Sequence, residues 1–600
     1  MPLNAQSIYP AVDPQFIPFP SRRSVVHSTK GIVSSTQPLA SQAGIKILEA
    51  GGNAADAAVA VAAALNVTEP SSTGIGGDMF CLFYDAASKT VRALNGSGRS
   101  GAHATLERMR KELGIAEGES GGIPSSSVHA VTVPGAAAGW VDCVERFGSG
   151  KVGMGEVLGP AVELAEGGFP VGELAAGFWR KCEELIKGAS PNGAEVLKSD
   201  AEAPGRCRAP RAGEIMKTPA LAKTFRLLAE HGKKGFYEGE VADAIIKVVT
   251  DLGGLLTHDD LKHHCETGTE DTEPIKVKVD IPEMINRSKS AGNEQGPVDL
   301  WEHPPNGQGI VPLITLGILQ DLIKTGQLKK LSPGDHNSPE YLHALIESLR
   351  LAFSDAHHHL ADPSHSPLPP LLSPPYLSSR AALFSPTTTA THPPGFPALS
   401  RSDTVYLAVT DRHGNAASFI NSVYSGFGSG IVPPGTGFAL QSRGANFVLR
   451  DGHANALAPR KRPYHTIIPA MVTDGATGDL HTVYGVMGGY MQPQGHVQVL
   501  MNMLVFGMSP QAALDAPRVC IGAGLPDQGD VMDATVFVEE GMGKRTVEGL
   551  MGLGHAVEVV GGYGRGLFGR GQVIRAHWEG EQVVYSAGSD PRGDGAAVPQ

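Results

Sequence analysis

The 600-residue chain is poor in charged side chains. They make up 18 % of its residues, against about 25 % in a typical soluble protein. Its 49 basic and 61 acidic residues leave a net charge of −12. This mild acidic excess gives no electrostatic reason to bind nucleic acid or an anionic membrane surface. We therefore expect neither nucleic acid nor a membrane as a partner.

Cysteines and long apolar runs are also scarce. The six cysteines are scattered without a CxxC pair, which argues against a disulfide scaffold or a zinc site and favours buried thiols. The most prominent apolar run, 57–65, has nine residues, whereas a membrane span needs about 20. The first thirty residues hold five prolines and no apolar run suited to a signal peptide. The sequence thus predicts a cytoplasmic protein.

Glycine and proline, by contrast, are abundant, at 76 and 44 residues. This share of one residue in five indicates a large globular protein with many turns, in which backbone often approaches backbone or ligand closely. Its core is large enough to need neither a metal nor a disulfide for stability.

A glycine-rich turn follows the first helical stretch. Residues 37–66 predict one helix, 74–78 form the turn, and 79–84 alternate like a strand. A dinucleotide-binding glycine loop follows a strand and opens a helix, whereas this loop precedes a strand. The order favours a structural turn near a ligand pocket, with nucleotide binding as the alternative.

The most abrupt change in composition lies just after the middle of the chain. Residues 363–400 hold ten prolines and one charged residue, Arg380. Proline cannot donate to a sheet, so we predict an exposed, flexible linker over 363–402. The preceding His357–His359 run predicts a solvated helix end, because three adjacent helical side chains point in different directions and cannot chelate one ion together.

The linker leads directly into a predicted hairpin. Residues 404–410 favour a buried strand, 411–415 a turn and 416–423 the return strand. If Thr410 pairs with Ala416, Thr404 stands opposite Ser422. Side chains that face each other across a strand pair are close enough for a hydrogen bond between hydroxyls.

Thr404 would become an N-terminus if the Asp403–Thr404 bond were cut. A free α-amine has a pKa of about 7.7–8.0, so it could act as general base for its own side-chain hydroxyl. An ordinary sheet threonine is the alternative. A second strand, 481–486, runs into Gly488 and Gly489, whose N–H groups could stabilise an oxyanion. An apolar helix is predicted over 497–506.

These motifs together resemble the γ-glutamyltranspeptidase family of N-terminal nucleophile hydrolases, over residues 23–593. The resemblance lies in motifs that follow one another in this order: Gly51–Ala57, Gly74–Asp78, Val133–Gly135, Pro304–Gly309, Asp403–Thr404, Asp411–Asn415, Phe427–Gly430, Lys461–Pro463, Gly488–Gly489 and Ala516–Arg518.

The resemblance implies a proenzyme that cuts itself between Asp403 and Thr404. It implies a large subunit 1–403 and a small subunit 404–600, which remain together as a heterodimer and can dimerise further. The two subunits would form one α/β domain, a four-layer α/β/β/α sandwich. Thr404 would be the nucleophile, Ser422 its supporting hydroxyl, and Gly488 and Gly489 the oxyanion hole. The implied reaction attacks a γ-glutamyl amide such as glutathione and passes the acyl group to water or an amino acid, without a cofactor.

The substrate-binding positions depart from the glutathione-cleaving branch. The arginine that grips the glutamyl α-carboxylate falls on Ser97, and Arg99 is its candidate replacement. The other matched positions, which we take as candidate substrate contacts, are Tyr424, Arg443, Asn446, His465 and Thr466. Among them Arg443 stands for a glutamine and Asn446 for an aspartate.

These changes alter the charge that the pocket would present. Loss of the aspartate removes attraction for an α-amine, and an arginine can hold a carboxylate with two hydrogen bonds. The sequence therefore predicts an amide hydrolase for a small acidic amide such as oxamate or a glutaryl-type amide, as in the diverged branch that resembles oxamate amidohydrolases. Conventional γ-glutamyl transfer and glutathione hydrolysis are the alternative, and a non-catalytic scaffold that keeps the fold is a third possibility.

Overall fold

The computed structural model describes residues 23–116, 119, 121–286, 296–389, 404–521 and 535–600. Two seven-stranded sheets form its centre. The first has the order β21 (Ala596–Pro599), β2 (Ile32–Ser35), β12 (Val405–Thr410), β13 (Ala416–Ser422), β3 (Asp78–Asp85), β4 (Thr90–Gly96) and β9 (Glu270–Thr272). The second has the order β1 (Val26–Ser28), β20 (Gln582–Ser589), β19 (Arg570–Glu579), β15 (Leu480–Met487), β14 (Ala470–Asp474), β11 (Val298–Glu302) and β10 (Ile275–Val279).

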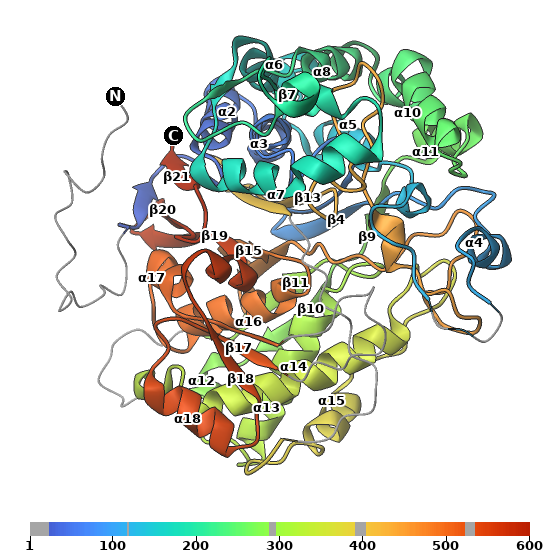
Figure 1. Ribbon diagram of the computed structural model, residues 1–600. Coiled ribbons are helices and arrows are strands. Elements are labelled where there is room, and N and C mark those ends of the chain that lie inside the picture. The colour runs from blue at the N-terminus through green and yellow to red at the C-terminus, as the bar shows by residue number, and fades with distance from the viewer. Residues whose placement is uncertain (1–22, 117–118, 120, 287–295, 390–403, 522–534) are drawn as a thin grey trace.

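Helices cover the outer face of each sheet, as Figure 1 shows. One core on the side of the first sheet joins α2 (Pro38–Glu49), α3 (Ala54–Thr68), α5 (Ala136–Phe147), α6 (Met154–Gly167), α7 (Glu173–Ala189), α8 (Pro219–His231), α9 (Lys234–Tyr237), α10 (Gly239–Asp251) and α11 (His258–Thr267). A second core, on the side of the second sheet, joins α12 (Ile281–Met284), α13 (Ile310–Lys324), α14 (Pro339–His359), α15 (Pro374–Ala381), α16 (Met491–Leu504), α17 (Pro510–Asp515) and α18 (Lys544–Gly552).

Smaller elements complete the described chain. A three-stranded sheet joins β16 (Val519–Ile521), β17 (Val536–Glu539) and β18 (Val557–Val560). Two two-stranded sheets pair β5 (Phe169–Pro170) with β8 (Ile215–Met216) and β6 (Lys198–Ser199) with β7 (Cys207–Arg208). The helix α4 spans Leu106–Glu112.

The alternation of side chains along the strands builds the layers. In β12, Val405, Leu407 and Val409 join the core beneath the first set of helices, whereas Tyr406 and Ala408 face the other way. The latter two belong to a middle core that also contains Met471 and other residues of the second sheet. This is the period of two that a strand buried on both faces must have. The result is the predicted four-layer α/β/β/α sandwich.

The predicted hairpin forms in the predicted register. Thr410 pairs with Ala416 and Val405 with Asn421. Its two strands lie inside the first sheet, because β12 also pairs with β2 and β13 with β3. Strands that follow residue 403 are thus flanked by strands that precede it.

The single helix predicted over 37–66 is wrong, because two helices form there. The first ends at Glu49, and Gly51 adopts a φ of +102° that other residues rarely adopt. Asn53 then caps α3: its side chain accepts from the N–H of Asp56, whose carboxylate accepts from the N–H of Asn53. This reciprocal cap starts a new helix. All fifteen residues of α3 are buried.

The linker predicted as exposed and flexible over 363–402 is exposed in its described part, but that part contains secondary structure. Residues 363–389 are largely on the surface, yet they contain α15, and four apolar side chains anchor them: Leu371, Leu377, Ala381 and Phe384. Two prolines open this helix, where a missing N–H costs nothing. The remainder, 390–402, lies outside the described residues.

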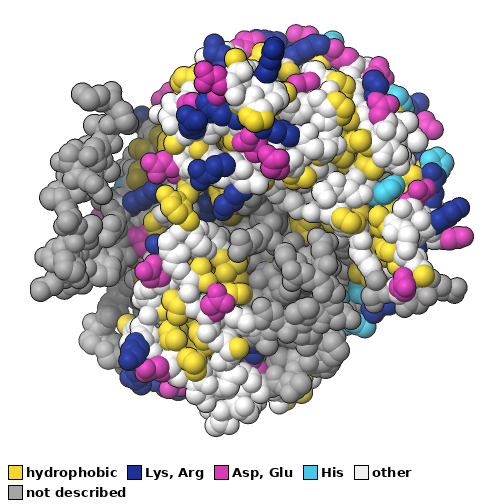
Figure 2. All heavy atoms as spheres, in the orientation of Figure 1, with side chains coloured by type: hydrophobic (Ala, Val, Ile, Leu, Met, Phe, Trp, Pro, Cys, Tyr) yellow, Lys and Arg dark blue, Asp and Glu magenta, His cyan; other side chains and the backbone are white. Residues whose placement is uncertain are grey.

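The helix predicted over 497–506 begins earlier, at Met491. Pro493 occupies its first turn, which tolerates proline because those N–H groups have no intrahelical partner. No helix in the described ranges is long and apolar enough to cross a bilayer. On the face in Figure 2, basic and acidic side chains are interspersed over the described surface, unlike the single-sign patch of a nucleic-acid-binding face.

Candidate active site

Thr404 and Ser422 meet at the open end of the central hairpin. The hydroxyl of Thr404 donates to Ser422 Oγ at 3.1 Å, and both side chains are fully buried. Ser422 Oγ also accepts from the N–H of Tyr424 at 2.9 Å. The register places the two hydroxyls together, and this contact fixes the orientation of Ser422. Asp403, on the other side of the predicted cleavage site, lies outside the described residues.

A buried guanidinium lies next to this hydroxyl pair. Arg443, in the short turn η5 (Arg443–Asn446), donates to Thr466 Oγ1 at 2.8 Å and to Ser422 Oγ at 3.4 Å. Its guanidinium stacks over the Tyr424 ring at 4.4 Å, and its Nε has no hydrogen-bond partner. Burial lowers the pKa of Arg443 to about 10, so it remains charged at neutral pH. Among the described residues, no carboxylate forms an ion pair with it.

The nearest buried carboxylate, Asp78, is fully engaged by other donors. Its Oδ1 accepts from the N–H of Gly98, the N–H of Gly135 and the side chain of Gln441, at 2.9 to 3.0 Å. Its Oδ2 lies 3.0 Å from Nε2 of His465. Burial favours the neutral carboxylic acid, but the contact with His465, the positive charge of Arg443 and the N–H of Gly98 outweigh burial and hold the pKa of Asp78 below its ordinary value. Asp78 thus ties four chain segments together around the site.

His465 is oriented by this contact and is not left to reach a ligand. Its Nδ1 accepts from the N–H of Ile467 at 3.3 Å, so Nε2 carries the proton and donates to Asp78. Burial, with the positive charge of Arg443, lowers the pKa of His465 to about 3. The neutral ring therefore holds Thr466, its chain neighbour, where Arg443 reaches it.

Replacing Asp78 by asparagine should destabilise the fold. We expect Asp78→Asn to lower the free energy of unfolding by about 3 kcal/mol, because buried donors lose a charged acceptor. Since the folded-state pKa lies below the unfolded value, this stabilisation is present above about pH 3.8 and is lost as the pH falls through the folded pKa. Urea unfolding at pH 7 measures the effect. Asp479→Asn, which removes a carboxylate from an exposed pair with Lys89, is the control, and an equal loss in both variants would contradict this role.

The two glycines after β15 have backbone conformations that suit glycine, with φ of +132° at Gly488 and +58° at Gly489. Their carbonyls are fixed: Gly488 O accepts from the N–H of Met491 at 2.9 Å, and Gly489 O accepts from the side chain of Gln308 at 2.9 Å. In a trans peptide the N–H points opposite to the carbonyl. The N–H of Gly489 is therefore held away from Met491.

Gln308 links these glycines to the arginine contact. Its amide nitrogen also donates to Thr466 O at 2.6 Å, and its amide oxygen accepts from the hydroxyl of Tyr464 at 2.9 Å. Hydrogen bonds thus connect Gly489, Thr466, Arg443, Ser422 and Thr404 in one buried network. Asp78 and Gln308, which hold these segments together, both lie in motifs noted in the sequence. Sequence reasoning missed their roles, because these depend on contacts between segments far apart in the chain.

Two other candidate substrate contacts, Arg99 and Asn446, do not contact the hydroxyl pair. Arg99 forms an ion pair with Glu270 at 2.6 Å, on the edge strand of the first sheet. Asn446 is partly exposed and donates to Tyr464 O at 2.9 Å. Arg443 and Thr466 therefore contact the hydroxyl pair or its neighbours, whereas Arg99 and Asn446 bond to other segments.

The glycine turn before β3 is packed against its own chain. A Cβ on Gly77 would lie 2.2 Å from Ser422 O, and one on Gly76 would lie 2.3 Å from Ala439 O. The whole turn is buried. It is the predicted structural turn, because its glycines allow the backbone to approach β13 closely. A phosphate-binding loop would instead need N–H groups open to a ligand.

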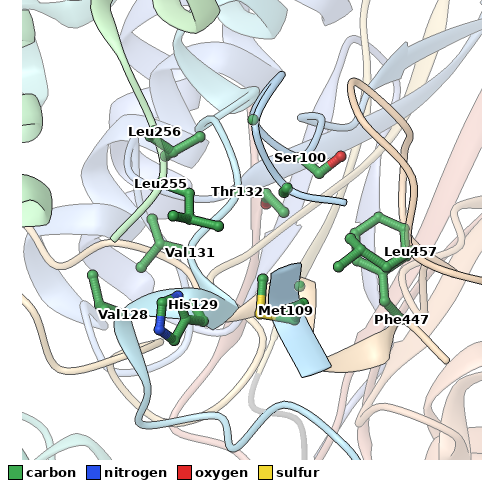
Figure 3. A pocket seen from close by; sticks show the side chains of 13 residues that line it. Ser100, Met109, Val128, His129, Val131, Thr132, Leu255, Leu256, Phe447 and Leu457 are labelled. Carbon is green, nitrogen blue, oxygen red and sulfur yellow. The ribbon is translucent and has the colours of Figure 1, made fainter. Parts of the chain in front are cut away.

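A small cavity borders the turn that carries Arg443. Figure 3 shows its lining, which is mostly apolar and includes Ser100 and Gly444, the chain neighbours of Arg99 and Arg443. Thr132 Oγ1 and His129 Nδ1 line it without a hydrogen-bond partner. Its volume of about 20 Å³ is room for about one water molecule. It cannot hold a substrate as it stands.

One group of side chains in the described residues has the composition of a metal site. His343 and Glu347 of α14 face His555, and all three are buried. His343 Nε2 donates to Ser385 O, so its Nδ1 accepts from His555 Nε2 at 2.8 Å. Arg350 donates to Glu347 at 2.7 Å and lies 3.5 Å from His555 Nδ1. A hydrogen-bonded chain beside a guanidinium fits these contacts better than an ion does.

Comparison with known proteins identifies the relatives of this chain. The γ-glutamyltranspeptidase family model matches residues 40–600. A protein of Bacillus subtilis named glutathione hydrolase-like YwrD proenzyme is 37 % identical over 96 % of this chain and 99 % of its own length. The oxamate amidohydrolase proenzyme of Klebsiella pneumoniae is 32 % identical over 95 % of this chain and 98 % of its own.

A solved structure is similar over nearly its whole length. The cephalosporin acylase from Bacillus halodurans superposes with a TM-score of 0.82 at 38 % identity, covering 98 % of this chain and 99 % of that one. The similarity spans both sheets and their helices. The relatives named here are thus hydrolases or acylases that share one fold.

Proposed function

Because this chain belongs to the γ-glutamyltranspeptidase family of hydrolases, we propose that it is a self-cleaving amide hydrolase that acts through an acyl-enzyme on Thr404. Cleavage of the Asp403–Thr404 bond leaves two chains, 1–403 and 404–600, held together by the sheets they share. The names of the curated relatives as proenzymes support this maturation.

Cleavage supplies the base that the reaction needs. The new α-amine of Thr404 takes the proton of its own hydroxyl as Oγ1 attacks the amide carbonyl carbon. Negative charge then develops on the carbonyl oxygen, where the N–H groups of Gly488 and Gly489 donate to it. The amine leaves with the proton from the Thr404 ammonium, and water releases the acid from the acyl-enzyme. Ser422 holds the Thr404 hydroxyl for the attack.

The substrate we propose is a small amide that carries a carboxylate, such as oxamate. The observation that carries this proposal is the charged, buried Arg443, which contacts Ser422 and has no ion pair with any described carboxylate. The charge of Asp78 offsets this cation only through space, because the Asp78 carboxylate is taken up by other donors. The free Nε of Arg443 is therefore a donor that a substrate carboxylate would satisfy. The guanidinium lies so close to the hydroxyl pair that a short acyl group can reach both.

The resemblance in sequence to an oxamate amidohydrolase supports an acidic acyl group, and the resemblance to a cephalosporin acylase supports cleavage of an amide. Conventional γ-glutamyl transfer is the second candidate, favoured by the relatives named glutathione hydrolases. The neutral Asn446, which bonds to Tyr464 O, offers no charge for an α-ammonium group.

Parallel assays distinguish the two substrates. We expect the purified protein to release ammonia from oxamate with a kcat/KM at least about tenfold above that for glutamate release from glutathione, because Arg443 attracts the carboxylate and repels the α-ammonium group. Coupled assays of ammonia and glutamate at pH 7.5 measure both rates. Preferred turnover of glutathione would overturn the proposed substrate class.

A further inference from the structure

A buried carboxyl group and a buried histidine meet behind the two glycines of the candidate oxyanion hole. Glu302 ends β11, His496 lies in α16, and both side chains are fully buried. Glu302 Oε1 and His496 Nδ1 are 2.8 Å apart. The other polar atom of each side chain, Oε2 of Glu302 and Nε2 of His496, has no hydrogen-bond partner among the described residues. Each group therefore depends on its single contact with the other.

His496 joins the two elements between which the glycine pair is held. The strand β15 leads into the pair, and α16 begins just after it. The hydroxyl of Tyr484, in β15, donates to the backbone carbonyl of His496 at 3.3 Å, and the centroids of the two rings are 5.3 Å apart. A Cβ on Gly495 would lie 2.6 Å from the side chain of Val486, so the helix packs closely on the strand. Fixing His496 therefore fixes the turn between β15 and α16.

Glu302 holds the other side of the same turn. A short segment joins it to Gln308, whose amide nitrogen donates to Gly489 O at 2.9 Å. A Cβ on Gly309 would lie 3.0 Å from the Cβ of Glu302, so this segment folds back onto the end of β11. The contact with His496 thus closes a ring that runs from β11 through Gln308 and Gly489 into α16.

The surroundings of Glu302 favour its neutral form. Its carboxyl group has one hydrogen-bond partner among the described residues, and no described lysine or arginine pairs with it. Asp78, by contrast, accepts from Gly98, Gly135 and Gln441 and also contacts a histidine. A buried carboxylate needs such donors. Burial raises the pKa of Glu302 well above its ordinary value and lowers that of His496 to about 3, so the contact joins two neutral groups.

We propose that Glu302 and His496 form a neutral hydrogen-bonded pair that positions Gly488 and Gly489 for the oxyanion. This inference rests on the proposed function, because it assigns positioning residues to the oxyanion hole of the same amide hydrolysis. Donors that are already fixed need no reorganisation as negative charge develops on the carbonyl oxygen. A neutral pair suits this place, since a carboxylate buried behind the glycines would repel that charge.

Two substitutions at Glu302 test both the pair and its neutrality. Glu302→Gln keeps the shape and can still donate to Nδ1 of His496, so we expect kcat for oxamate to stay within about threefold of the unchanged value. Glu302→Leu leaves Nδ1 without a partner. It should lower kcat at least about tenfold while KM changes less than about twofold, because the oxyanion exists only in the transition state. Equal losses of kcat in the two variants would overturn the neutral pair.

Gln498→Leu is the matched control on the same helix. Gln498 is buried, and its amide donates to Val519 O at 2.9 Å and accepts from the N–H of Val519 at 2.8 Å. It therefore fixes α16 to β16 and not to β11. This variant should lose stability in urea unfolding, as Glu302→Leu does, yet keep kcat within about twofold. If it lowered kcat as much as Glu302→Leu, the effect would be a general loosening of α16, and the pair would have no positioning role.

An infrared readout needs no turnover and covers the case in which Glu302→Leu does not fold. The difference spectrum between the unchanged protein and Glu302→Gln at pH 7.5 should contain the carbonyl stretch of a protonated carboxylic acid, which lies above the carboxylate bands. A carboxylate band in its place would overturn the inference even in an active enzyme. Failure of the proposed function has a different signature, namely the carboxylic acid band in a protein that hydrolyses no acidic amide.

Discussion

Thr404→Ala should leave the protein as one uncut chain without amidase activity. The substitution removes the hydroxyl that donates to Ser422 at 3.1 Å, and no other described hydroxyl replaces it at the start of β12. We expect a single band near the 62.6 kDa of the full chain on a denaturing gel, where the unchanged protein gives two. Activity should fall at least about 10³-fold, as when other enzymes lose their nucleophile.

Two matched variants separate chemistry from packing. Thr404→Ser keeps the hydroxyl and should still cut itself, because only a methyl group is lost. Ser422→Ala keeps the nucleophile but removes its hydrogen-bond partner, so we expect slower cleavage. If Thr404→Ala gave two fragments of the expected sizes, Thr404 could not be the residue that performs the cut.

Arg443→Gln should have the second-largest effect, on substrate binding. We expect kcat/KM for oxamate to fall about 100-fold, since a charge-assisted contact contributes about 1.5–3 kcal/mol and each 1.4 kcal/mol is a factor of ten. The loss should appear mainly in KM if the guanidinium holds the carboxylate equally in the ground and transition states. Steady-state kinetics with oxamate measure it, and Arg450→Gln, at an exposed position, is the control.

A double variant tests Arg443 through a gain of glutathione turnover relative to oxamate turnover. The double variant Arg443→Gln/Asn446→Asp introduces the glutamine and the aspartate that the glutathione-cleaving branch carries at these two positions. It should increase the ratio of glutathione to oxamate turnover beyond that of either single variant, because the new carboxylate attracts an α-ammonium group. A lower or unchanged ratio would mean that Arg443 acts only as a structural cation.

The sequence was informative wherever local pattern decides the structure. The alternation in 404–410 and 416–423, with a turn at 411–415, sufficed to predict the register that brings Thr404 to Ser422. The strand that runs into Gly488 and Gly489 follows from the same alternation. A short hairpin is fixed by its own turn, so no long-range information was needed.

The rest depends on contacts between segments far apart in the chain. Asp78 receives donors from Gly98, Gly135 and Gln441, and no local pattern indicates that they converge. The helix predicted over 37–66 failed because a reciprocal cap at Asn53 competes with helix continuation. The helix α15 inside the proline-rich stretch was not predicted, because prolines also begin helices and because the buried apolar side chains that anchor it give no local signal.

The most direct test of Thr404 as an N-terminal nucleophile is mass spectrometry of the protein quenched during turnover of an acidic amide. The prediction is two fragments, the smaller beginning at Thr404, with the mass of the acyl group added to the peptide that contains Thr404. An active protein that stays in one chain, or an acyl group on any other residue, would contradict it.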